Sequence, residues 1–206
     1  LRAMTRMEPP SRPATDKSTS AVVPTVAWPE ALLTEDGAFC GYLMPRVDLS
    51  VAVPIAVVEN PARREQRDWT SELGIEKRAI VAMNLAFLLG QIHQTGVVVG
   101  DLNQSSVVVS ASLIVTFLDC CSMQIKDSQG RDHLCEASTP GFVAPELVGK
   151  DLQAHARSAS SDLFNLAVHV YLLLLDRHPF RNGIYTGSGE KPAAEVLAQR
   201  GQWRGR

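Results

Sequence analysis

The chain has 206 residues, of which 45% are hydrophobic and 20% are charged, a balance typical of a folded globular protein. Its formal net charge of −2 gives no electrostatic basis for binding nucleic acid or an anionic membrane surface, so we expect neither as a partner. The length predicts one large domain, or one domain with an appendage.

Cysteine content and the lack of a membrane or secretion signal favour a cytoplasmic protein. The most apolar run, residues 166–175, is about half the ~20 residues that a membrane span needs, so we expect a buried helix there. No basic and apolar secretory signal opens the chain. Because the first residue is Leu1 rather than Met, we expect a fragment of a longer protein that carries further domains. The four cysteines, Cys40, Cys120, Cys121 and Cys135, form neither a disulfide framework nor a zinc pattern. We expect the adjacent Cys120 and Cys121 to be inert buried thiols.

The first quarter of the chain predicts an irregular connection followed by a hairpin. Residues 7–24 hold four prolines and several Ser and Thr without an apolar period. Residues 26–47 read as two strands around the turn signal Asp36-Gly37, and Pro45 ends the second strand.

The remainder predicts helices around a short buried strand pair. Apolar spacing predicts a helix over residues 76–94 that Gly96 ends, and the Val- and Ile-rich runs 106–110 and 113–119 predict two strands buried on both faces. Residues 122–139 read as one long loop. We expect a second helix over residues 161–175, capped by Ser160 or Ser161, and a weaker third helix over residues 191–199.

Two acids stand at the margins of the strand pair. Asp101 lies in "GDLNQSSVVV", just before the first strand, and Asp119 ends the second strand. A strand, a turn and a strand bring these carboxylates near each other. Taken alone, acids at strand edges are most often caps or turn residues, and that interpretation stays open on spacing alone.

Six segments in a fixed order resemble the C-terminal lobe of protein kinases, and above all bacterial protein-kinase-like proteins with "GDLN" in the catalytic loop. The segments are "GYLMPRV", "LLGQIHQTG", "GDLNQSSVVV", "LDCC", "TPGFVAPEL" and "SDLFNLAVHVYLLLLDRHPF". The resemblance implies an α+β, protein kinase-like fold that is mainly the helical C-lobe. Residues 1–47 would be a partial N-lobe, and residues 48–206 a C-lobe truncated at its C-terminus.

The resemblance also implies roles for individual residues. Asp101 would accept the hydroxyl proton of a protein substrate, and Asp119 would hold the Mg²⁺ that bridges the phosphates of ATP. Ser106 stands at the second metal position, where a kinase has Asn. Five residues would meet the adenine of ATP: Met44 as gatekeeper, Pro45, Arg46 and Val47 as hinge, and Val108 beneath the ring. Three have structural roles: Asn103, Glu146 in the "APE" segment, and Asp162 in the following helix.

Several departures from the kinase pattern keep two functions open. The usual Arg before the catalytic Asp is Gly100, the metal-loop triplet ends in Cys121, and no Gly-rich loop with a strand Lys precedes residue 26. We therefore expect little phosphoryl transfer from this chain alone. The sequence favours a Ser/Thr protein kinase that uses ATP and Mg²⁺, and the alternative is a pseudokinase that acts as a binding or scaffolding module.

Overall fold

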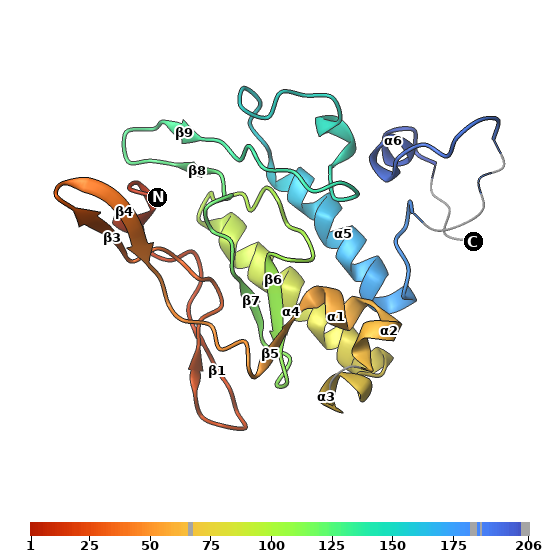
Figure 1. The fold of residues 1–206 in the computed structure, drawn as a ribbon, viewed down its shortest axis with the longest axis horizontal. Helices are drawn as coiled ribbons and strands as arrows, with labels where there is room; N and C mark the ends of the chain where they lie inside the picture. The colour runs from red at the N-terminus through yellow and green to blue at the C-terminus, as the bar shows by residue number, and fades with distance from the viewer. Residues whose placement is uncertain (66–67, 182–184, 186, 203–206) are drawn as a thin grey trace.

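A computed structural model describes residues 1–65, 68–181, 185 and 187–202, which form an α+β protein of helices and small antiparallel sheets (Figure 1). The helices are α1 (Ile55–Glu59), α2 (Pro61–Arg64), α3 (Asp68–Ser71), α4 (Ile75–Gln94), α5 (Ala159–Leu175) and α6 (Ala194–Gln199), with 3₁₀ turns at Met4–Arg6 and Pro145–Leu147. The strands are β1 (Ala14–Thr15), β2 (Val22–Val23), β3 (Ala31–Glu35), β4 (Ala38–Leu43), β5 (Ala52–Pro54), β6 (Val107–Ser110), β7 (Val115–Phe117), β8 (Ile125–Lys126) and β9 (Asp132–His133).

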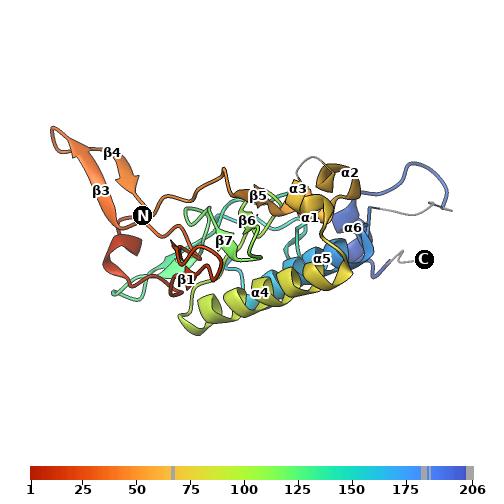
Figure 2. The same cartoon turned by 90° about the horizontal axis from the view of Figure 1, so that it is seen from below.

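The predicted hairpin is confirmed as β3 and β4, which pair antiparallel. Asp36 and Gly37 form its turn with φ of 49° and 81°. Two successive positive φ angles suit the right-handed twist of a tight hairpin, and Asp-Gly tolerates them. The hairpin projects away from the helical part of the molecule (Figure 2).

The buried strand pair is also confirmed, as β6 and β7, and all residues of both strands are buried. Val107, Val109 and Phe117 belong to the main hydrophobic core, whereas Val108 points to the opposite face. The sequence did not predict β5, which pairs with β6 as a third strand. Three residues that end in Pro54 are too short for a period-2 pattern, and only pairing with β6 defines them as a strand.

Helices α4 and α5 pack side by side beneath the sheet (Figures 1 and 2). Four residues on one face of α4 are buried in the main core: Val81, Leu85, Leu89 and Ile92. Helix α5 starts at Ala159 with Ser158 as N-cap, so the predicted caps Ser160 and Ser161 lie inside the helix. Thr95 caps the end of α4, and Gly96 follows with φ of 78°.

Two segments predicted to be irregular contain short hairpins, so those predictions are wrong in part. Strands β1 and β2 lie within residues 7–24, and β8 and β9 lie within residues 122–139. Two-residue strands leave no periodic signal in a sequence. Helices α2 and α3 lie on either side of Gln66 and Arg67, which are outside the described residues. Among the helices described, none has the length and apolar character that crossing a membrane requires.

Candidate functional site

Asp101 is held in a tight loop with one carboxylate oxygen already bonded. Its side chain is 8% exposed, and Oδ2 accepts hydrogen bonds from Nδ2 of Asn103 (3.0 Å) and Oγ1 of Thr139 (2.9 Å). Oδ1 accepts none from the described residues. Asn103 is fixed in turn, because its Oδ1 accepts from both the backbone N–H and the hydroxyl of Ser105. The carboxylate is therefore oriented, with one oxygen open to a ligand.

Ser106 connects the loop of Asp101 to Asp119. Its hydroxyl accepts from the backbone N–H of Asn103 (3.0 Å) and lies 3.0 Å from the carbonyl oxygen of Asn103. Its backbone carbonyl accepts from the N–H of Leu118 (2.9 Å), the residue before Asp119. Because β6 begins where β7 ends, these contacts place Asp101, Ser106 and Asp119 at the same end of the strand pair.

Asp119 is exposed and carries a second partly open carboxylate. Its Oδ1 accepts from the backbone N–H of Cys121 (3.1 Å), and Oδ2 has no partner among the described residues. Two carboxylates supply the hard oxygen ligands that Mg²⁺ requires, and this ion is commonly held by one or two carboxylates together with substrate phosphates. No group of three His, Cys, Asp or Glu side chains in the described part of the chain could hold a metal without such help. The residues therefore fit a magnesium ion that arrives with phosphate.

The five predicted adenine-contacting residues line two neighbouring cavities of about 350 and 410 Å³. Met44 and Pro45 line the smaller cavity with Leu118, and Val108 lines the larger one. Arg46 and Val47 border both. Residues 44–47 form no backbone–backbone hydrogen bond with any described residue, so the N–H groups of Met44, Arg46 and Val47 and the four carbonyls have no backbone partner there.

Asp162 supports the Asp101 loop from helix α5. Its buried carboxylate accepts from the backbone N–H groups of Val99 (2.7 Å) and Gly100 (2.8 Å), and it also contacts Nε2 of His93 at 2.8 Å. The sequence assigned His93 no role, and no local signal could have done so, because its partner lies 69 positions away. Glu146, by contrast, is exposed and forms no ion pair within the described residues.

A second side chain of α5 ties the loop after Asp101 to the segment that follows Thr139. Nδ2 of Asn165 donates to the carbonyls of Leu102 (3.0 Å) and Phe142 (2.7 Å). The sequence reasoning missed Asn165. A polar residue inside an apolar helix was the available signal, because a buried amide must find partners.

A buried pair of ionisable residues supports the same loop from the other side. Glu59 at the end of α1 contacts Nδ1 of His169 with one carboxylate oxygen and accepts from Nε2 of Gln104 (2.6 Å) with the other. Glu59 is 2% exposed and His169 is fully buried. The loop from Asp101 to Ser106 is thus anchored to both α1 and α5.

Comparison with known proteins finds relatives among protein kinases. No protein-family model matches the chain. Protein kinase YegI of Escherichia coli O157:H7 is 36% identical over 163 residues, which are 75% of this chain and 24% of YegI. The YegI protein of strain K12 is 35% identical over the same shares. Rhodopsin kinase GRK1 of Rattus norvegicus is 32% identical over 54% of this chain and 18% of that kinase.

The chain belongs to the protein kinase-like superfamily. It spans about a quarter of the length of the YegI proteins.

The two cysteines that follow Asp119 differ in their burial, although the sequence predicted both to be buried. Cys120 is buried as expected, and burial raises its pKa to about 12. The expectation of a buried thiol is wrong for Cys121, which is exposed and lies 3.0 Å from the hydroxyl of Tyr42 on β4. This hydrogen bond is the main cause that raises the pKa of Tyr42 to about 12, so the phenol stays protonated at neutral pH.

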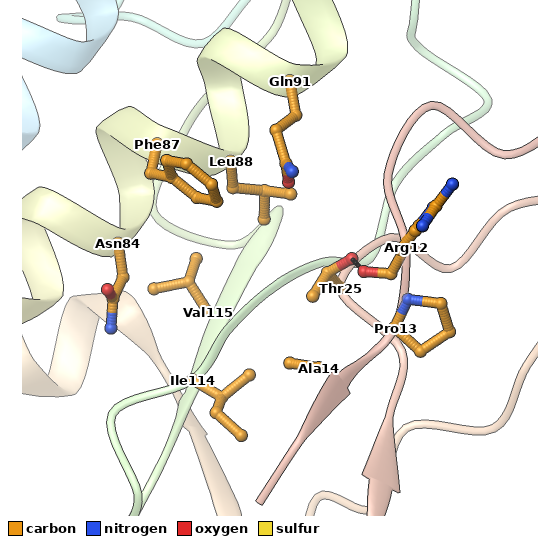
Figure 3. Close-up of a pocket in the computed structure, with 10 residues that line it drawn as sticks. All are labelled: Arg12, Pro13, Ala14, Thr25, Asn84, Phe87, Leu88, Gln91, Ile114 and Val115. Carbon is orange, nitrogen blue, oxygen red and sulfur yellow. Dashed lines mark hydrogen bonds between the residues drawn. The ribbon is translucent and has the colours of Figure 1, made fainter.

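A further cavity of about 370 Å³ lies between α4, β7 and residues 12–14, away from the two acids (Figure 3). Val115 faces this cavity, whereas its neighbour Thr116 faces the cavity beside Val108. Its polar lining is occupied in part: Gln91 accepts a hydrogen bond from Ser11. None of the predicted site residues lines it.

Proposed function

We propose that this chain is the part of a Ser/Thr protein kinase that binds ATP and Mg²⁺ and orients the protein substrate. The supporting observation is the placement of Asp101 and Asp119 at one end of β6 and β7, each with an open carboxylate oxygen. We further propose the domain assignment suggested by the sequence, with residues 1–47 as a partial N-lobe and 48–206 as a C-lobe of the kinase fold.

In this proposal, Oδ1 of Asp101 accepts the hydrogen bond of the attacking hydroxyl and directs it toward the γ-phosphate. The contacts from Asn103 and Thr139 leave that oxygen free and fix its direction. Asp119 holds the magnesium, which supplies positive charge to the phosphate oxygens. Residues 44–47 and Val108 form the adenine pocket. Asp162 acts indirectly, by fixing the backbone before Asp101.

Phosphoryl transfer from radiolabelled ATP to protein serine and threonine tests this function. The assay uses the longest natural polypeptide that contains the sequence, and compares Asp101→Asn with Asp151→Asn as an exposed control. We expect Asp101→Asn to lower kcat by at least about a hundredfold. Equal kcat in the wild type and Asp101→Asn would remove Asp101 from this role.

One observation favours a pseudokinase that acts as a binding or scaffolding module. The hydroxyl of Ser106 is used by both backbone groups of Asn103, so it is a weak candidate for a second metal ligand. A scaffold of this kind would contact its partners without transferring phosphate. Absence of transfer from a polypeptide that still binds its partners would support this alternative.

A further inference from the structure

Arg157 is a buried arginine that none of the predicted roles includes. It lies two residues before α5 and is 6% exposed. Its guanidinium donates through Nη1 to the carbonyl of Gly100 and through Nη2 to the carbonyl of Ala137. These carbonyls belong to two different segments: Gly100 directly precedes Asp101, and Ala137 lies two residues before Thr139.

The backbone of Arg157 is held as firmly as its side chain. Its N–H donates to Oε1 of Gln124 (2.8 Å), and its carbonyl accepts from Nε2 of the same side chain (2.9 Å). Gln124 is itself paired through its backbone with Val98, on the segment that leads to Gly100. Hydrogen bonds therefore hold both the backbone and the guanidinium of Arg157.

The surroundings of Gly100 leave no room for a side chain. Its φ is 81°, and a Cβ there would lie 2.6 Å from Sγ of Cys135. Its N–H donates to Asp162 while its carbonyl accepts from Arg157. The two peptide groups on either side of Gly100 are thus each held, the preceding one by Asp162 and the one that joins Gly100 to Asp101 by Arg157.

The positive charge of Arg157 acts on the thiol of Cys135. Its side chain forms no ion pair with a described carboxylate, yet it lies in the neighbourhood of two buried acids. Burial raises the pKa of Cys135 above all, Arg157 lowers it, and Asp101 and Asp162 raise it. All three charges therefore act on the thiol of Cys135, and the arginine acts with the opposite sign to the two carboxylates.

We propose that Arg157 is a positioning residue that clamps the Asp101 loop to the segment of residues 137–139 through two carbonyl oxygens. Because Thr139 donates to Asp101, the clamp sets both the backbone before the catalytic carboxylate and the side chain that orients it. The planar guanidinium reaches both carbonyls at once, which a lysine ammonium on a flexible stem does not reproduce. The role of Asp101 in this proposal rests on the proposed kinase function; the clamp itself does not.

The thiol of Cys135 reports on the clamp without any need for catalysis. Cys135 is 1% exposed and packs against Gly100, so an alkylating reagent reaches it only when the clamped segments separate. Cys120 is 2% exposed and donates to the carbonyl of Ala27, away from Arg157, which makes it an internal reference. Exposed Cys40 and Cys121 are blocked first.

The experiment compares Arg157→Met and Arg157→Lys with Arg78→Met. Arg78 is the matched control because it is also buried (8% exposed), bonds a carbonyl through its guanidinium, and has an Nε without a described partner. Its partners, Leu173 and Asp176, lie at the far end of α5. We expect both Arg157 variants to raise the alkylation rate of Cys135 relative to Cys120 by at least about tenfold, and Arg78→Met to leave this ratio within about twofold.

Phosphoryl transfer by the natural polypeptide gives the second readout. We expect Arg157→Met and Arg157→Lys to lower kcat while KM for ATP stays within about threefold, because residues 44–47 are untouched. Unchanged protection of Cys135 in Arg157→Met, or full protection and kcat in Arg157→Lys, would overturn the clamp. If Arg157→Met does not fold, the alkylation rate of Cys135 and kcat are compared between Arg157→Lys and the wild type. An inactive wild type whose Cys135 still responds would overturn the proposed kinase function and leave the clamp supported.

Discussion

Replacing Asp162 with Asn tests how strongly the Asp101 loop depends on one buried carboxylate. Asp162 is fully buried and accepts two backbone N–H groups and a histidine contact. Asn has nearly the same shape, but one oxygen becomes an NH₂ group that faces a donor. The variant therefore isolates the hydrogen-bonding capacity of the carboxylate from its packing.

The expected loss follows from these contacts. One hydrogen bond to a charged acceptor is lost, which costs about 1.5–3 kcal/mol, and one buried N–H of Val99 or Gly100 is left unpaired, which costs a further ~1–3 kcal/mol. We expect the free energy of unfolding to fall by about 2.5–6 kcal/mol. This is a large share of the ~5–15 kcal/mol typical of a domain.

Equilibrium unfolding in urea measures this loss, and amide hydrogen exchange locates it. We expect the slope of free energy against urea to stay unchanged, and the amides of Val99 and Gly100 to lose protection before the amides of α4 do. Asp151→Asn is the control, because Asp151 is exposed and the amide oxygen can still accept from Gln153; we expect less than about 0.5 kcal/mol there. A loss below about 1 kcal/mol for Asp162→Asn would refute the reasoning.

Three further predictions concern buried groups around the site. Burial, above all, lowers the pKa of His178 to about 4, and its Nδ1 accepts two backbone N–H bonds, which keeps the folded state neutral at this residue. The free energy of unfolding is therefore greatest above pH ~6.5 and falls by up to about 3 kcal/mol as the pH drops toward ~4. Urea unfolding across this pH range measures the fall, and we expect His178→Asn to flatten it. Gly100→Ala should destabilise by at least about 1 kcal/mol more than Gly96→Ala in urea unfolding, because both glycines have positive φ but only Gly100 lacks room for a Cβ; equal losses would contradict this. Glu59→Gln should lower the free energy of unfolding by about 1–3 kcal/mol because one of the two buried oxygens that contact His169 and Gln104 becomes an NH₂ group, and a neutral effect in urea unfolding would count against these contacts.

Long periodic segments were predictable from sequence, whereas short elements were not. Helix α4 begins within one residue of its predicted start, and the Asp36-Gly37 turn and the buried strand β6 are where their patterns placed them. The three-residue strand β5 is defined only by its partner, because three residues are too few to show a period. Sequence spacing predicts local structure well where many side chains repeat one preference.

The two acids of the site could be predicted from the sequence, whereas the residues that hold the surrounding loops in place could not. Motif order singled out Asp101 and Asp119, and their mutual placement follows from the strand pair between them. His93, Asn165 and Arg157 were assigned no role, because each acts on backbone or side-chain groups at least 20 residues away. Tertiary hydrogen bonds of this kind leave no spacing in the sequence.

A thermal-shift titration with ATP, with and without magnesium, tests the shared nucleotide and metal site most directly. A ligand that binds only the folded chain must raise its melting temperature. We expect ATP to stabilise the wild type and Asp151→Asn in a magnesium-dependent manner, and Asp119→Asn to lose that dependence. An equal shift without magnesium, no shift at all, or a wild-type response from Asp119→Asn would contradict a metal site at Asp119.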